Sequence, residues 1–218
     1  MEPIITLPST ALKAALLFAP ESDIRYYLNG VHVECTHTGD VHVVATDGTA
    51  VFVHKEMGAQ VARPGPWAFT LARASLAKLL KDKAVSVSVF ATPDGFAIGG
   101  GDGLLISFKA VEGKFPDWRR ILPREESMSG QASLYSTDIL AAAGKALAYV
   151  DGLPARAGAY HGELHQNGTA PGVVVGKTGN TVVAIAPRRI TAKNPMAADW
   201  FVPAAYEAPT KDDFTDLA

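Results

Sequence analysis

The stretch Ala11-Leu-Lys-Ala-Ala-Leu-Leu17 has two counterparts further along the chain. Ser75-Leu-Ala-Lys-Leu-Leu-Lys81 begins 64 residues later, and Ile139-Leu-Ala-Ala-Ala-Gly-Lys-Ala-Leu147 begins another 64 residues after that. Apolar residues recur at helical spacing in all three, which predicts three short helices. The expected N-caps are Ser9, Thr70 and Thr137. A fixed period of this kind indicates one supersecondary unit that is present three times.

Between these helices the apolar period changes from 3.6 to 2, which is typical of β-strands. Three strands are expected after each helix, at 31–33, 41–43 and 51–53, at 85–89, 96–98 and 104–108, and at 158–165, 172–175 and 181–186. One more strand is expected before each helix, at 4–7, 67–70 and 131–135. The repeated unit is therefore β-α-β-β-β, and the fold class is α+β. Because one helix covers only part of a small sheet, two units should pair.

The repeat predicts one and a half domains. Residues 1–123 hold two units and should form a complete domain, and residues 124–190 hold one unit, a half domain. The segment 112–126 contains prolines and charges and is expected to be a linker. Residues 191–218 lack a clear period and are interpreted as a C-terminal tail, docked in part through Trp200, Phe201 and Tyr206.

The composition narrows the class of protein. The chain has 218 residues, 48% of them hydrophobic, and a net charge of -2, which excludes extended disorder. The sequence has no long apolar run and no basic leader, so we expect no membrane span and a cytoplasmic location. A lone Cys35 fits a reducing compartment. The net charge argues against a general nucleic-acid coat, but it allows cations that are concentrated on one surface.

The residues that could carry chemistry are better explained as structural residues. His161, Glu163 and His165 share one face of an expected strand and could bind zinc, but a solvent-facing polar row is favoured. The segment Gly99–Gly103 precedes a strand rather than a helix, which indicates a hairpin turn and not a phosphate loop. Cys35 is interpreted as a core residue. We therefore expect no enzyme activity, no metal and no cofactor.

Cations are concentrated on the expected helices. They are Lys13, Arg73, Lys78, Lys81 and Lys145, and few carboxylates accompany them. A single such helix would indicate only a solvated face. The same bias in three repeated helices favours a basic surface directed at phosphates.

Several segments resemble the bacterial sliding clamp, the beta subunit of DNA polymerase III. They are Ile24-Arg-Tyr-Tyr-Leu-Asn-Gly30, Val44-Ala-Thr-Asp-Gly48 and Glu112-Gly-Lys-Phe-Pro-Asp-Trp-Arg-Arg-Ile-Leu-Pro123. Thr6-Leu-Pro8 is similar to the start of that family's middle domain, and Ala184-Ile-Ala-Pro-Arg-Arg-Ile190 is similar to its C-terminal ending. The resemblance implies a DNA-clamp fold, with helices lining a ring around double-stranded DNA and antiparallel sheets outside.

The resemblance also implies two sets of site residues. The helix cations, together with Arg25, Tyr26 and Tyr27, are expected to contact DNA without sequence specificity. A hydrophobic groove is expected to bind peptide motifs of a polymerase and other clients, and its walls would be Leu28, Thr46, Gly48, Val51, Pro116, Arg120, Ile121, Ile185, Pro187 and Ile190. Thr49-Ala50 stands where the family usually carries larger, basic residues, which allows a different choice of clients.

The unit count predicts the assembly. Two family chains of six units each make a ring of twelve, so three units per chain predict a homotetramer whose half domains meet. If the segment after Glu125 were a degenerate full domain, a trimer would result. A clamp loader is a further possible partner, and a compact variant would suit a mobile genetic element such as a phage or plasmid. The alternative is a partial clamp that does not encircle DNA and instead occupies client peptides or modulates a host clamp.

Overall fold

The structure is a computed structural model that describes residues 2–81, 85–100, 103–109, 111, 113–153 and 162–188. Met1–Arg188 form one compact unit. His161, Ile190 and the tail 191–218 are named in the predictions above and lie outside the described residues. The division into domains at residue 123 stays a prediction.

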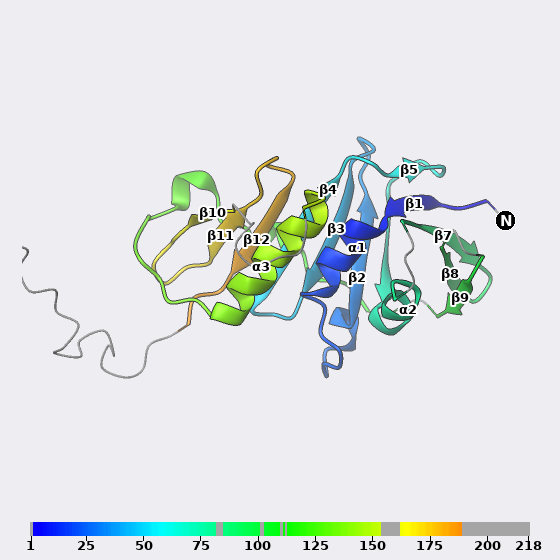
Figure 1. Cartoon of the computed structure of the whole chain (residues 1–218), viewed down its shortest axis with the longest axis horizontal. Coiled ribbons are helices and arrows are strands. Elements are labelled where there is room, and N and C mark those ends of the chain that lie inside the picture. Colours follow the sequence, from blue (N-terminus) through cyan, green and yellow to red (C-terminus); the bar gives the residue numbers. More distant parts are fainter. Residues whose placement is uncertain are drawn as a thin grey trace, which may run out of the picture. The chain divides into compact units, whose positions relative to one another are not determined.

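The helices have the predicted spacing. They are α1 (Ser9–Leu16), α2 (Arg73–Leu79) and α3 (Thr137–Val150), so their first residues are 64 apart in each case (Figure 1). The predicted caps are wrong, since none of the three helices has a side-chain cap hydrogen bond. Ser9 and Thr137 are themselves helical, and Thr70 lies in a strand. The helices are instead stabilised by burial of one apolar face.

The strands form two antiparallel sheets. The seven-stranded sheet has the order β10-β11-β12-β4-β3-β2-β6, and the five-stranded sheet has the order β5-β1-β7-β8-β9. The strands of the larger sheet are β2 (Gly30–Cys35), β3 (Val41–Thr46), β4 (Ala50–Glu56), β6 (Trp67–Ala72), β10 (Glu163–His165), β11 (Gly172–Val175) and β12 (Thr181–Ile185). Those of the smaller sheet are β1 (Ile5–Pro8), β5 (Gln60–Val61), β7 (Ser86–Thr92), β8 (Gly95–Gly99) and β9 (Leu105–Phe108). The α+β class is confirmed, and β5 is a strand that the alternation of apolar residues did not predict.

The first two units exchange their leading strands. β1 precedes α1 but pairs with β7 of the second unit, and β6 precedes α2 but pairs with β2 of the first unit. Each sheet therefore contains strands from both units. This exchange interlocks the two units into one structure.

The strand predicted at 131–135 is wrong. These residues form no ladder, and their backbone bonds include Gly168 N–H to Gln131 O at 2.9 Å and Arg188 N–H to Leu134 O at 2.7 Å. The reason is topological. If the third unit followed the exchange of the first two, the strand before α3 would belong to the sheet of a fourth unit, and the described residues contain none.

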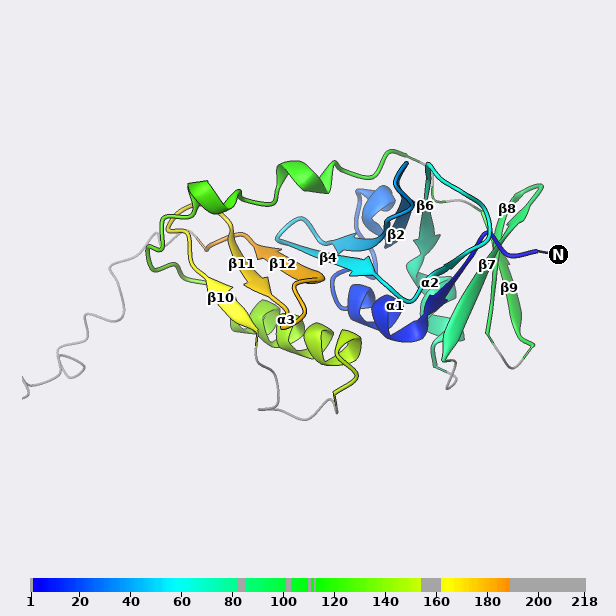
Figure 2. The ribbon, with the colours of Figure 1, turned by 90° about the horizontal axis from the view of Figure 1, so that it is seen from above.

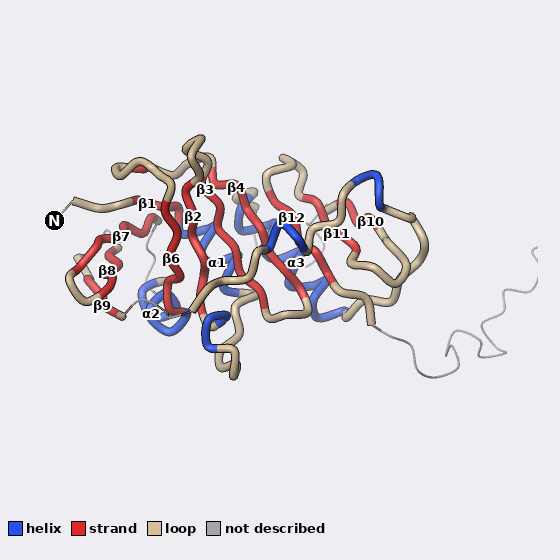
Figure 3. The backbone as a smooth tube through the Cα atoms, turned by 180° about the vertical axis from the view of Figure 1, so that it is seen from behind, coloured by secondary structure: helices blue, strands red, loops and turns tan. Residues whose placement is uncertain are grey.

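The larger sheet is covered on both faces. Figure 2 shows α1 and α3 on one side of it and the segment after residue 113 on the other, and Figure 3 shows that segment crossing the strands. The core on the helix side contains alanines of both helices, among them Ala11, Ala14 and Ala15 on α1 and Ala143 and Ala146 on α3. Their small side chains allow the two helices to pack directly on each other.

The third unit joins the first through β12 and β4. Val183 lies opposite Phe52 in this ladder, and both side chains are fully buried. The third repeat unit therefore shares a sheet and a core with the first unit. The remaining edge strand of this unit, β10, has a neighbour on one side only among the described residues.

Candidate DNA-facing surface and peptide groove

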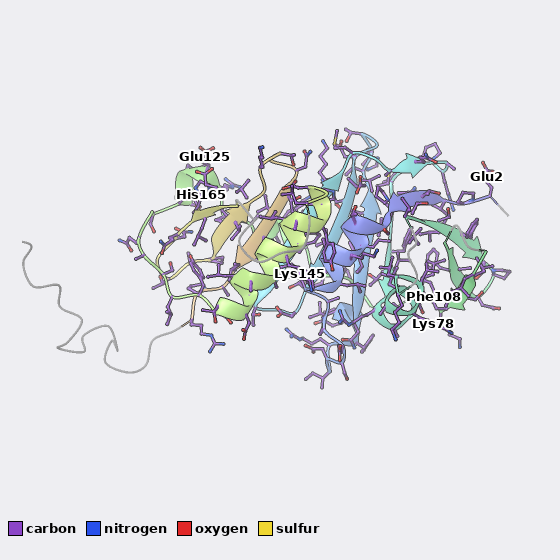
Figure 4. All side chains as sticks on the ribbon, viewed as in Figure 1. Glu2, Lys78, Phe108, Glu125, Lys145 and His165 are labelled. Carbon is purple, nitrogen blue, oxygen red and sulfur yellow. The ribbon has the colours of Figure 1, made fainter. Side chains whose placement is uncertain are left out.

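Four lysines lie on or directly beside the helices. Lys78, Lys81 and Lys145 are exposed and Lys13 is half-buried, and Figure 4 labels Lys78 and Lys145. None of the four belongs to an ion pair found among the described residues. The Lys145 ammonium lies 6.0 Å from the centre of the Tyr149 ring, which is a weak cation–π contact. These charges can therefore act on an external anion.

Arg73 forms contacts within the chain that the sequence did not predict. Its guanidinium donates to the carbonyl oxygens of Leu16 and Ala19, the latter at 2.7 Å, and lies 3.4 Å from Glu21 Oε1. These carbonyls lie at and just beyond the C-terminal end of α1, where a cation is favoured by the helix dipole. Arg73 thus makes a structural contact between two units, and its contact with DNA stays a prediction.

The loop before β2 is braced by Arg25. Its guanidinium forms an ion pair with Asp23 at 2.7 Å and donates to the carbonyl oxygen of Asp47 at 2.9 Å. The Arg25 hydrogen bonds lower the pKa of the Asp23 carboxyl to about 2. The guanidinium also lies against Gly48, which has φ +88°, so a side chain there would be strained and would displace the guanidinium. Arg25 therefore connects this loop to the β3–β4 turn.

The other residues of this loop differ in exposure. Tyr26 is 57% exposed, whereas Tyr27 packs against the buried cluster beneath it. Ile24 was not assigned a role from the sequence, but its side chain is 97% exposed. An apolar side chain in this position adds to the contact surface of the loop.

The predicted groove residues gather at the β3–β4 turn and the crossing segment. Thr46 Oγ1 donates to Ala50 O at 2.7 Å and accepts from Gly48 N–H, which fixes the turn. Leu28 and Val51 are buried in a cluster on the face of the sheet away from the helices. Ile121 is 38% exposed. Of the remaining predicted walls, Gly48 and Arg120 are exposed, and Pro116 and Pro187 are half-buried.

One predicted groove residue is wrong. Ile185 is fully buried in the core on the helix side, so its side chain cannot contact a peptide on the opposite face. Adjacent residues of a strand point to opposite faces, and Ala184 lies opposite Val51 in the β12–β4 ladder. Ala184 therefore lies on the groove side of β12, where it is buried at 1% exposure. A shift of one residue in the sequence comparison reverses the face.

The crossing segment docks through aromatic residues and one ion pair. Phe115 stacks on the His32 ring at 4.5 Å, and Trp118 is buried beside His42. Both Phe115 and Trp118 belong to the cluster that contains Leu28 and Val51. In this structure the expected linker therefore covers part of the predicted groove walls.

Glu34 is the acidic partner in this docking. Its carboxylate pairs with the Arg119 guanidinium and lies 3.3 Å from His42 Nδ1. The guanidinium also lies 4.1 Å from the centre of the Trp118 ring. Burial raises the pKa of Glu34, but the His42 and Arg119 side chains lower it by more, to about 2. Burial lowers the pKa of His32 to about 4. A pocket of about 570 Å³ borders these groups.

The burial of His32 beneath the crossing segment predicts that the free energy of unfolding depends on pH. His32 has a folded pKa of about 4 against 6.5 when unfolded, so the unfolded chain binds more protons between these values. The stability that His32 contributes is present above pH 6.5 and is lost as the pH falls toward 4. We expect a loss of about 2 kcal/mol between pH 7.5 and pH 5, measured by urea unfolding. His32→Gln should remove most of this loss, and an equal loss in that variant would contradict the assignment.

Solved structures of sliding clamps share this architecture. Matches include the Caulobacter crescentus pol III beta (19% identity, TM-score 0.58), the DNA polymerase III subunit beta from Pseudomonas aeruginosa (18%, 0.61) and the Helicobacter pylori beta clamp bound to a DNA ligase peptide (13%, 0.64). The chain has the sliding-clamp fold. The matches cover 85%, 85% and 87% of this chain and 65%, 65% and 67% of those chains, so this clamp-like chain spans about two thirds of their length. No protein-family model matches the sequence, and no curated protein matches it.

The described residues of this clamp fold give little evidence for a metal site or a membrane-spanning helix. No group of three or more His, Cys, Asp or Glu side chains in the described ranges could hold a metal ion. Of the zinc set considered from the sequence, Glu163 and His165 lie 3.5 Å apart, and His161 is outside the described residues. No helix in the described part of the clamp-like chain is long and apolar enough to cross a bilayer.

Proposed function

We propose that this chain is a DNA sliding clamp, a processivity factor for replication that acts without chemistry of its own. The observation that carries the proposal is the group of lysines on the helix side, Lys13, Lys78, Lys81 and Lys145, which form no ion pair among the described residues. In contrast, Glu34, Asp40 and Glu56 on the sheet are paired with nearby cationic or histidine side chains. Helices with unpaired cations suit a surface that faces the phosphates of duplex DNA.

Such a surface would bind DNA without reading its sequence. Lysine contacts to phosphate oxygens are the same for every base pair, and their strength falls as salt rises. Retention on DNA would come from topological linkage in a closed ring. We propose that four chains form the ring, and the alternative is a ring of three chains. The protein would be cytoplasmic, and a clamp loader could place it on DNA. A compact ring of this kind suits a mobile genetic element.

Clients would bind at the β3–β4 turn. The H. pylori clamp of similar fold is bound to a DNA ligase peptide. In this chain the client peptide would contact the exposed Gly48, Arg120 and Ile121 together with Pro116 and Pro187. Ala184 replaces Ile185 in this set of residues. A polymerase or other client would dock a short apolar motif there. Full access to Leu28 and Val51 would require the segment with Trp118 to move.

The encirclement can be tested on circular DNA. The purified protein is loaded onto a nicked plasmid, and the complex is separated from free protein by gel filtration in moderate salt. A ring should stay with the circular plasmid and be released when the plasmid is cut once, because the contacts are unchanged but the topology is lost. Equal retention on circular and linear DNA would contradict encirclement. A plasmid blocked at both ends after cutting controls for nuclease damage.

The open edge of β10 favours one alternative. A partial clamp with an unpaired edge could remain a single chain and bind client peptides or a host clamp without surrounding DNA. Native mass spectrometry separates the two functions, because a monomer at every accessible concentration would exclude the ring. Peptide binding by that monomer would then support the alternative.

A further inference from the structure

The exchange of the strands that precede the helices shows which strands a complete pair of units requires. In the described structure each of the first two units places the strand before its helix at the edge of the other unit's sheet. Leu7 and Leu71 lie two residues before their helices, and both are fully buried by this arrangement. Each unit therefore gives one strand and receives one strand.

The third unit lacks both halves of this exchange among the described residues. Its leading segment 131–135 belongs to no sheet, and its β10 has a neighbour on one side only. Two apolar side chains are left in water as a result, because Leu134 is 50% exposed and Leu164 is 40% exposed. An open strand edge with exposed leucines is a site for pairing with another chain.

The side chain of Leu164 faces a surface that should be buried. It lies opposite Val174 in the β10–β11 ladder, and Val174 is a member of the core on the helix side. Val33 has the same position in the first unit, opposite Val43, and is fully buried because β6 lies beside it. Leu164 is therefore a core position whose neighbouring strand is missing.

We propose that a second copy of this chain supplies that strand. The segment 131–135 of each copy would pair antiparallel with β10 of the other about a two-fold axis, so that two half domains make one complete domain. The arrangement is isologous, since each copy gives and receives the same strand, and it leaves no open edge at this contact. It goes beyond the proposed ring by specifying how chains join, and it does not depend on DNA binding.

The register follows from the exchange that the structure shows. Phe69, four residues before α2, lies opposite Val33, and the equivalent residue before α3 is Ser133. Ser133 of one copy is thus expected opposite Leu164 of the other, and Tyr135 opposite Gly162. In the present structure the Tyr135 ring is buried against Gly172 of its own chain, so the exchange requires this ring to leave that position. The Ser133 N–H, now bonded to the side chain of Gln166 at 2.8 Å, would exchange that bond for a backbone one.

Disulfide cross-linking tests the register directly. In a Cys35→Ala background, a protein with Ser133→Cys is mixed with a protein with Leu164→Cys and mildly oxidised. The expected product is a dimer that contains one copy of each variant, seen by non-reducing electrophoresis and mass spectrometry. The matched control is Leu134→Cys mixed with Leu164→Cys, because residue 134 points to the opposite face and should cross-link at least tenfold less.

Two outcomes would overturn the proposal. One is the absence of the mixed dimer with folded proteins, checked by circular dichroism, and the other is equal cross-linking of the control pair. A second measurement needs no cysteine. Leu164→Asp should break this contact, so that the native mass spectrum shifts from tetramer to dimer, or from dimer to monomer if no ring forms. An unchanged spectrum would contradict the contact. A cross-linked dimer without retention on circular DNA would refute the ring alone. Retention without the cross-link would refute the exchange alone.

Discussion

Reversing the charge of Lys78 and Lys145 together should lower the affinity for duplex DNA by about tenfold or more at 0.1 M salt. Both side chains are exposed on helices, and the described structure gives neither an ion-pair partner, so the charge is directed outward. Lys78→Glu with Lys145→Glu replaces two attractions to phosphate by two repulsions in every chain. The slope of log K against log salt should become shallower, because fewer counterions are released. Fluorescence anisotropy with labelled duplexes of two unrelated sequences measures both effects.

Lys114→Glu is the matched control for this prediction. Lys114 is also exposed, but it lies on the segment that crosses the face of the sheet opposite the helices, beside the pocket at His32. Reversal of this one charge, half the change in the double variant, should therefore alter the affinity by less than about twofold. If the control weakened DNA binding as much as the helix variant, the helices would not be the DNA-facing surface. A difference between the two duplex sequences would contradict phosphate recognition.

Phe52→Ala should lower the free energy of unfolding by about 4 kcal/mol. Phe52 is fully buried, stacks on Phe18 with ring centres 5.6 Å apart, and lies opposite Val183 of the third unit. The substitution leaves a cavity at the point where the third repeat unit joins the sheet of the first unit. Urea unfolding followed by circular dichroism measures the change, and one transition is expected because both parts share a core.

Ile24→Ala provides the comparison for Phe52→Ala. Ile24 is 97% exposed, so removal of its apolar atoms should change the free energy of unfolding by less than about 0.5 kcal/mol. Two separate unfolding transitions in the wild-type chain, with only one of them moved by Phe52→Ala, would show that the third unit folds independently. That result would contradict a shared core.

Much of the fold could be predicted from short-range patterns. The first residues of the three helices are 64 apart, as the repeated apolar spacing predicts, and nearly every strand expected after a helix is present within the described residues. The caps could not be predicted from residue type alone. Ser9 and Thr137 have the right chemistry, but the backbone becomes helical at these residues rather than after them. Packing of the apolar faces, and not a cap, sets where each helix begins.

The roles of several site residues could not be predicted from the sequence. Lysines on helices were identified by residue type, yet Arg73 has the same charge and is used to hold the end of α1. Ile185 and Ala184 are neighbours in the sequence, but only the ladder with β4 shows which of them faces the groove. Glu34 and Arg119 are 85 residues apart and carry no local signal of their pairing.

The sequence by itself determined the repeat, the elements of each unit and the excess of cations on the helices, because these depend on residues close together along the chain. Only the tertiary structure decided which strand joins which sheet, which side chains remain free, and how the segment with Trp118 covers Leu28 and Val51. These features depend on contacts between residues far apart in the sequence, where the burial of apolar surface and the pairing of backbone groups select one arrangement. The segment 131–135 is the clearest case, since its sequence resembles a strand but it belongs to no sheet of the described residues.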